Sequence, residues 1–327
     1  QPNGSLPWII EPPLARSLST AWRCPNADAF ARELVPWAKA KHPKCKGMAS
    51  CFTPISNYRC YAVLLGETGS IYLGLNVEIP GTAEATTLHA EQFASLLSAG
   101  VGGGGSRLNE TGLISLAQRG TGAPCGHCRQ WLAEFADAPK LVLLGTAGTA
   151  RPMSAIFVDS FGPLALNNTC PLLSTNPRCV RARAVREPTS FADQLSRAAV
   201  KAALASYSPY AKRRSGVALR TRGNKIYASG VFESVALNPS VQPVVAALVD
   251  LIVRGGAVAG PQWGSGIVEA VHAEEEEEEV LDVDVEASGD SELFAGRHAW
   301  PSYVAHTRSV LRSLAPNATV RVVRFAS

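Results

Sequence analysis

The sequence lacks any apolar run that could cross a bilayer as a helix, which takes about 20 consecutive residues. Its first residues, 1–13, are rich in proline and do not show the charged segment followed by an apolar one that marks a secretory leader. These two absences predict a cytoplasmic protein that makes no contact with a membrane.

The chain also has a small net charge and few cysteines. The net charge of the 327 residues is +4, which neither requires nor excludes a nucleic-acid partner. Eight cysteines over this length predict free thiols in a reducing compartment rather than a disulfide framework. In such a compartment the N-x-S/T triplets, which begin at Asn3, Asn109, Asn167 and Asn317, would not be glycosylated.

Two of the cysteines belong to a pattern with a chemical meaning. His89-Ala90-Glu91 is followed along the chain by Pro124-Cys125-Gly126-His127-Cys128. One imidazole and two thiolates leave a tetrahedral zinc ion with a free fourth position, as in sites that activate water. No second C-x-x-C occurs that would close a structural zinc site. The combination of H-x-E with P-C-x-x-C is typical of zinc-dependent deaminases.

Both halves of this pattern are expected at the starts of helices. Cys125 and Cys128 are three positions apart, so they share one face of a helix, and Pro124 suits its first turn. His89 and Glu91 are two positions apart, a spacing that lets both flank one ion only at the entrance to a helix. The sequence therefore predicts one catalytic zinc ion per chain. Glu91 is the only carboxylate that the pattern supplies for proton transfer.

Strand-like and helix-like segments alternate around these motifs. Short strands are expected at 58–65, 70–77, 113–116 and 140–144. The first two are joined by Gly66-Glu67-Thr68-Gly69, which is typical of a hairpin turn. Helical periodicity is expected at 28–40, although Pro36 would kink or break that helix. This mixture predicts an α/β layered domain.

The composition changes near residue 150, where proline, asparagine, serine and arginine replace the periodic patterns. We therefore expect four parts in the chain. They are an N-terminal extension at 1–27, a catalytic domain at 28–150, an interdomain connection at 151–188 and a second domain at 189–327.

The second domain repeats features of the first. Tyr227 and Glu233 are six positions apart, as are Tyr72 and Glu78. No cysteine follows Cys179, so the second domain has no thiolate ligands of its own. It is expected to be a duplicated copy that has lost its metal site.

The register of this duplication predicts which residues correspond. Ser208-Pro209-Tyr210 is similar to Ser56-Asn57-Tyr58. The expected helix at 241–253 aligns with the helix of the first motif, and in the register we favour Gln242 faces His89 while Val244 faces Glu91.

These segments together resemble the cytidine deaminase family, in particular its two-domain dimeric form from bacteria and plants. The matching stretches cover most of the chain and are Thr53-Pro54-Ile55-Ser56-Asn57-Tyr58, Gly74-Leu75-Asn76-Val77-Glu78, Leu88-His89-Ala90-Glu91-Gln92, Ala123-Pro124-Cys125-Gly126-His127-Cys128-Arg129-Gln130, Ser206-Tyr207-Ser208-Pro209-Tyr210 and Asn238-Pro239-Ser240. The resemblance implies a three-layer α/β/α sandwich that is duplicated, with a vestigial second copy. It also implies a homodimer.

The resemblance further implies hydrolytic deamination of cytidine and deoxycytidine in pyrimidine salvage. In this reading zinc is bound by His89, Cys125 and Cys128, and Glu91 moves the proton. The nucleoside is contacted by the side chains of Asn76, Glu78 and Tyr58 and by the backbone at Ala90 and Pro124. Asn76 and Glu78 would hold the ribose hydroxyls, and Tyr58 stands where a stacking phenylalanine is usual.

The chain also departs from the family pattern. Cys60 and Tyr61 replace a Val-Gly pair, and the bulk of Tyr61 is expected at the pocket wall.

Two other functions stay open. A polynucleotide-editing deaminase would use the same zinc chemistry, although residues that grip free ribose hydroxyls leave less room for a continuing strand. A catalytically inactive homologue that binds nucleosides or partners belongs to a different class, and the intact set of His89, Glu91, Cys125 and Cys128 argues against it.

Two further signals are set aside. His272-Ala273-Glu274 repeats the letters of the first motif, but it opens an acidic run to Glu279 and is expected in a solvated loop. The glycines at 102–105 lack the Lys-Ser/Thr of a phosphate loop and are expected to form a flexible connection.

Overall fold

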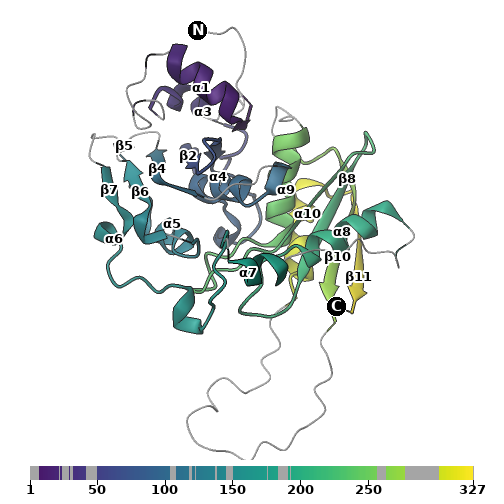
Figure 1. Ribbon diagram of the computed structural model, residues 1–327. Coiled ribbons are helices and arrows are strands. Elements are labelled where there is room, and N and C mark those ends of the chain that lie inside the picture. Colours follow the sequence, from purple (N-terminus) through teal and green to yellow (C-terminus); the bar gives the residue numbers. More distant parts are fainter. Residues whose placement is uncertain are drawn as a thin grey trace, which may run out of the picture.

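The computed structural model describes residues 7–21, 23, 29, 32–41, 50–103, 108–117, 120–121, 123–136, 138–144, 150–174, 176–182, 191, 193–255, 263–276 and 302–326. The chain forms two β-sheets, and helices pack against both of them (Figure 1). Within the described ranges, no helix combines the length and the apolar character needed to cross a bilayer.

The first sheet has seven strands in the order β1-β3-β2-β4-β6-β7, with β5 paired to β4. The strands are Ile9–Ile10 (β1), Cys60–Gly66 (β2), Ile71–Leu75 (β3), Leu108–Ala117 (β4), Gly120–Thr121 (β5), Val142–Leu144 (β6) and Ala150–Pro152 (β7). The predicted hairpin is confirmed, because β2 and β3 pair antiparallel and Gly69 takes a φ of 87° in the turn.

Helices of the first half pack against this sheet (Figure 1), and short 3-10 turns lie between the elements. They are Pro12–Ala21 (α1), Val35–Ala40 (α3), Glu84–Thr86 (η1), Ala90–Ser98 (α4), Val101–Gly103 (η2), Gly126–Leu132 (α5) and Ala138–Lys140 (η3). The predicted break near Pro36 is confirmed, because a turn at Leu34 separates the helical residues 32–33 from α3, and Pro36 lies in the first turn of α3. Trp8 stacks on Phe93 of α4, so residues before 28 pack onto the first sheet.

A glycine sets how closely α4 approaches the first sheet. A Cβ on Gly74 of β3 would lie 2.1 Å from the carbonyl oxygen of Ala90, so only glycine allows this contact. The same face of β2 carries Ala62, which pairs with Gly74, whereas Tyr61 and Leu75 point to the opposite face. The start of α4, where the first motif lies, is therefore held directly against the sheet.

The second sheet has four strands in the order β11-β10-β8-β9. The strands are Ser215–Thr221 (β8), Ile226–Gly230 (β9), Ile267–Glu275 (β10) and Thr319–Phe325 (β11), and the helices are Gln194–Leu204 (α8), Pro243–Gly255 (α9) and Val304–Leu314 (α10). Ala199 and Ala203 of α8 share an apolar cluster with Ala218, whereas Val244 of α9 shares a different one with Val217. Since adjacent strand residues point to opposite faces, the sheet lies between α8 and α9, which is the predicted three-layer arrangement.

The two halves repeat the same backbone bonds, which confirms the duplication. Val77 and Leu88 exchange two backbone hydrogen bonds of 2.9 Å, and Phe232 and Val241 do the same at 2.9 and 2.8 Å. His89 follows Leu88 and precedes α4 in the same way as Gln242 follows Val241 and precedes α9. The predicted correspondence of Gln242 with His89, and of Val244 with Glu91, is therefore confirmed.

One part of the predicted register is wrong. The carboxylate of Glu78 accepts the backbone N–H groups of Ile55 and Ser56, and that of Glu233 accepts those of Tyr210 and Ala211. Tyr210 thus corresponds to Ile55, three positions away from the predicted alignment with Tyr58. The predicted alignment matched identical serine and tyrosine residues. The true correspondence is given by the backbone N–H groups that the two glutamates bind.

The repeated letters at His272-Ala273-Glu274 lie in strand β10, so the prediction of a solvated loop is wrong. His272 and Glu274 are 0% and 1% exposed. The imidazole of His272 lies 3.0 Å from the hydroxyl of Ser215 and 2.8 Å from that of Thr307. His272 is therefore hydrogen-bonded inside the protein, whereas the acidic residues that follow it in the sequence had suggested exposure to solvent. The acidic run beyond Glu276 lies outside the described residues.

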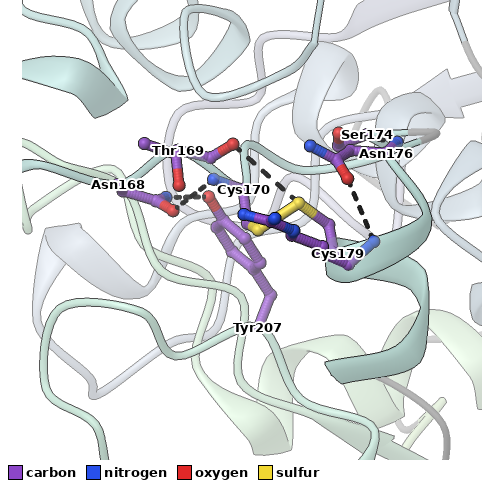
Figure 2. The surroundings of a disulfide bond; sticks show 8 residues. Asn168, Thr169, Cys170, Ser174, Asn176, Cys179 and Tyr207 are labelled. Atoms are coloured by element: carbon purple, nitrogen blue, oxygen red, sulfur yellow. Dashed lines mark hydrogen bonds between the residues drawn. A yellow bond between two sulfur atoms is a disulfide. The ribbon is translucent and has the colours of Figure 1, made fainter.

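The connection between the domains contains the helices Met153–Ile156 (α6) and Pro177–Ala182 (α7), the 3-10 turn Pro163–Leu166 (η4) and a disulfide between Cys170 and Cys179 (Figure 2). Cys51 is also disulfide-bonded. The prediction of free thiols is therefore wrong at these three positions, and the cysteine argument for a reducing compartment loses its basis. Composition cannot show which cysteines the fold brings together.

Candidate metal centre

The structure brings the three predicted metal ligands together. Nδ1 of His89 lies 3.5 Å from Sγ of Cys125 and 3.3 Å from Sγ of Cys128, and the two sulfur atoms are 3.6 Å apart. Tetrahedral zinc with bonds of about 2.0–2.3 Å requires its nitrogen and sulfur ligands to be roughly 3.5–3.8 Å from one another. The donor types and their separations therefore fit zinc.

Both motifs lie at helix starts, as the spacing predicted. His89 is the residue before α4 and Cys125 the residue before α5, and both have extended backbone angles (ψ of 154° and 171°). This conformation turns the side chains out before the helix coils, so they converge on one point. Cys128 follows in the first turn of α5 and is buried.

A buried hydrogen-bond chain fixes the two helices against each other. The indole N–H of Trp131 on α5 donates to the hydroxyl of Ser95 on α4 over 2.7 Å, and that hydroxyl donates to the carbonyl of Gln92 over 3.0 Å. Both Trp131 and Ser95 are 0% exposed. At the other end of α5, Arg129 donates to the carbonyl of Pro124 over 2.7 Å. The spacing of the ligands is therefore set by the protein.

The charges of the three donors are coupled. A hydrogen bond from Cys128, and next one from His89, lowers the pKa of Cys125 to about 3. The same bond to Cys125 and burial raise the pKa of Cys128, and the bond to Cys125 raises the pKa of His89. The ring of His127 stacks on that of His89 at 4.8 Å. A thiolate is thus present at Cys125 at neutral pH, which is the form that binds a metal.

Glu91 lies beside this donor group in the first turn of α4 and is 5% exposed. Its carboxylate contributes to the raised pKa of Cys128, which places it next to the buried ligand. Burial, and then the charges of Glu91, Cys125 and Glu78, raise the pKa of Cys60 to about 12. The Cys60 thiol is therefore within electrostatic range of the metal ligand Cys125, of Glu91 and of Glu78.

Asn76 and Glu78 are buried and hold the segment that carries Tyr58. The amide of Asn76 accepts the N–H of Cys60 over 2.8 Å and donates to the carbonyl of Tyr58 over 2.9 Å. Glu78 accepts the N–H of Ile55 over 2.8 Å. The side chain of Tyr58 is 38% exposed. The side chains of Asn76 and Glu78 therefore hold the 55–60 segment, which carries Tyr58, by hydrogen bonds.

The prediction that Tyr61 forms the pocket wall is wrong. Tyr61 is 2% exposed and pairs with Leu75, on the sheet face away from α4, where Lys39 of α3 lies 5.9 Å from its ring. Cys60, its neighbour in β2, faces the site instead. The alternation of side chains along a strand was the signal that distinguishes the two residues.

Ala90 and Pro124, whose backbone is predicted to meet the base, each lie next to a predicted metal ligand. Ala90 is the first residue of α4 and Pro124 precedes Cys125, and both are buried. An α/β sheet with a His/Cys/Cys group at two helix starts, and a buried glutamate beside them, defines a zinc enzyme that activates water.

Comparison with known proteins gives the family. Two models described as "Cytidine and deoxycytidylate deaminase zinc-binding region" match residues 36–144 and 153–286. The cytidine deaminase of Yersinia pestis (strain Pestoides F) is 35% identical over 224 residues, which is 68% of this chain and 67% of the relative. Cytidine deaminase 6 of Arabidopsis thaliana is 35% identical over 227 residues, 64% of this chain and 74% of the relative. The chain belongs to the cytidine deaminase family.

Among solved structures, cytidine deaminase from Burkholderia pseudomallei matches 40% of this chain and 98% of its own, with 26% identity and a TM-score of 0.31.

Proposed function

We propose that this protein catalyses the hydrolytic deamination of cytidine and deoxycytidine to uridine and deoxyuridine. The observation that carries the proposal is the group of His89, Cys125 and Cys128, whose donor atoms lie 3.3 to 3.6 Å apart. Glu91 lies beside that group, and relatives named cytidine deaminase support the choice of substrate.

The metal and the protein divide the chemistry between them. Zinc, when bound, supplies a Lewis acid that makes water a nucleophile at neutral pH. Glu91 accepts the proton of that water as its oxygen adds to the carbon that bears the amino group, and it passes the proton to the adjacent ring nitrogen. Glu91 then takes the second proton from the new hydroxyl group on that carbon and gives it to the amino group, so that a carbon–oxygen double bond forms as the carbon–nitrogen bond breaks and ammonia leaves.

The residues around Glu91 position the nucleoside. Asn76 and Glu78 hold the ribose hydroxyls with an amide and a carboxylate, which together accept and donate hydrogen bonds. Tyr58 contributes an exposed ring for stacking on the substrate. The backbone at Ala90 and Pro124 meets the edge of the base, which makes the site selective for a pyrimidine.

The domain organisation, the oligomeric state and the cellular location are also part of the proposal. The division into a catalytic domain at 28–150, a connection at 151–188 and a second domain at 189–327 stays a proposal, as does assembly into a homodimer. A cytoplasmic location is also a proposal, and the disulfide bonds of Cys51, Cys170 and Cys179 favour an oxidising compartment instead. Fractionation of the native cells decides between the two.

An ultraviolet assay of the zinc-loaded protein tests the activity. Cytidine, deoxycytidine and a short cytosine-containing oligonucleotide are measured side by side, with Glu91→Gln as the blank. We expect loss of absorbance for both nucleosides and none for the oligonucleotide. Activity on the oligonucleotide alone would establish an editing enzyme, and silence on all three with zinc bound would establish an inactive homologue.

A further inference from the structure

Gln92 connects a predicted zinc ligand to the second domain. It is the third residue of α4, is 2% exposed and is not itself a metal donor. Its carbonyl oxygen Oε1 accepts the backbone N–H of His89 over 3.1 Å, and its Nε2 donates to the carbonyl of Pro239 over 2.9 Å. One buried amide therefore spans from the residue that carries the ligand to a segment 147 positions away in the sequence.

The segment around Pro239 is fixed by the second domain. The hydroxyl of Ser240 accepts the backbone N–H of Ser234 over 2.9 Å. Val241 and Phe232 then exchange backbone hydrogen bonds, which ties the segment to the start of α9. The position of the Pro239 carbonyl is thus determined by the second domain and not by α4.

The backbone of Gln92 is held as firmly as its side chain. Its carbonyl accepts the hydroxyl of Ser95, which in turn accepts the indole of Trp131 on α5. An amide with both ends bonded in a buried site has no low-energy alternative position, because any other position would leave a buried polar group unpaired.

We propose that Gln92 is a positioning residue through which the second domain orients His89 for zinc. The inference rests on the proposed role of His89 as a ligand. It gives the second domain, whose described residues form no group that could hold a metal, a function in the chemistry of the first: it supplies the acceptor that holds Gln92, and Gln92 holds the backbone of the ligand. Partners that orient metal ligands in this way contribute strongly to metal affinity.

The test replaces Gln92 with methionine, which has a similar shape and neither hydrogen-bonding group. Competition with a chelator measures the dissociation constant of zinc, which we expect to rise about 10-fold. With cobalt in place of zinc, the visible absorption spectrum should change, since it reports the geometry of the ligands. At saturating zinc, kcat should fall more than KM rises.

A matched control lies on the same helix. Ser98 is buried and donates to the carbonyl of Ser95 over 2.7 Å, and it is the last residue of α4, at the end of the helix away from His89. Ser98→Ala should lower the melting temperature of the metal-free protein and leave the zinc dissociation constant unchanged. If Gln92→Met does not fold, Gln92→Asn, whose amide is too short to reach both partners, is expected to weaken zinc binding in the same direction.

The contribution of the second domain is tested separately by Ser240→Ala, which loosens the segment of Pro239. It should weaken zinc binding by about 2-fold or more in the wild-type background and have no further effect in Gln92→Met.

The outcomes separate the inference from the proposed function. Wild-type zinc affinity in Gln92→Met, or equal effects of Ser240→Ala in both backgrounds, would overturn the inference. A wild-type protein that binds no zinc would overturn the proposed function instead.

Discussion

The two domains have the same framework and opposite chemical content. Each has an antiparallel strand pair, a glutamate after the second strand and a buried helix that starts after a two-bond backbone bridge. Where the first domain has His89 and Glu91, the second has Gln242 and Val244. The fold therefore does not require the metal ligands, because the backbone pairing that positions them persists without them.

The paired glutamates show what each domain does with a buried carboxylate. Glu78 accepts backbone N–H groups with one oxygen and the hydroxyl of Ser56 with the other. Glu233 accepts backbone N–H groups too, but its Oε1 has no hydrogen-bond partner among the described residues. Burial raises the pKa of Glu233 to about 7.

The second domain also contacts the first through buried polar groups. Glu134, which follows α5, is 0% exposed and accepts the hydroxyls of Tyr207 and Tyr210 and the N–H of Val235. A side chain of the first domain thus accepts hydrogen bonds from polar groups of the second. The comparison shows that a buried carboxylate of the first domain forms part of the interdomain contact.

The largest expected effect comes from making Glu91 neutral, as its counterpart Val244 is. Glu91→Gln should lower kcat about 10³-fold, because general acid–base transfer contributes roughly 10²–10⁴-fold. The zinc content and the melting temperature should stay as in the wild type. Near-normal turnover in the ultraviolet assay would rule out Glu91 as the proton carrier.

The next effect concerns stability in the second domain. The pKa of Glu233 is about 7 in the folded protein and 4.5 ordinarily, so the folded state favours the protonated carboxyl. The stability that the protonated group contributes is therefore complete below pH 4.5 and is lost as the pH rises through about 7. Glu233→Gln removes this loss, so above pH 7 it should raise the free energy of unfolding relative to wild type by up to about 3 kcal/mol. Urea unfolding at pH 5 and pH 8 measures the difference, and identical pH dependence in both proteins would contradict it.

Removing the disulfide of the connection tests whether the domains are coupled beyond their polar contacts. Cys170→Ser with Cys179→Ser opens a loop with a separation of 9 residues. The free energy of unfolding should fall by about 2–3 kcal/mol, and zinc affinity should not change. The same double variant under reducing conditions serves as the control, since wild type and variant should then melt alike.

The smallest effect is expected from Asn76→Val. Valine is the residue at the equivalent position of the second domain, Val231. The variant loses the bonds to Cys60 and Tyr58 and the proposed contact with ribose. KM for cytidine should rise about 10-fold, or about 1.4 kcal/mol, with a smaller change in kcat. A fall in kcat at unchanged KM would mean that Asn76 acts on the reaction and not on the sugar.

The sequence predicted the metal centre well because its ligands lie in two short motifs with fixed spacing. His89 and Cys125 were expected at helix starts and are found there. The match of Gln242 with His89 was also predicted, since Tyr227 and Glu233 preserve the spacing that defines the register. Local patterns carry this information without any knowledge of the fold.

Features that depend on distant contacts were not predicted. The partner of Gln92 is the carbonyl of Pro239, and no local signal marks it. The disulfide of Cys170 requires α7 to fold back on the connection. Glu274 was assigned to solvent because of its acidic neighbours, whereas hydrogen bonds from Ser302 satisfy it inside the sheet.

The central claim is that the first domain alone carries the zinc chemistry of the chain. The most direct measurement is the zinc content of the purified protein by mass spectrometry, for wild type, His89→Gln and Gln242→Ala. We predict one zinc ion per chain in wild type and in Gln242→Ala, and none in His89→Gln. Two ions per chain, or zinc retained in His89→Gln, would contradict the account.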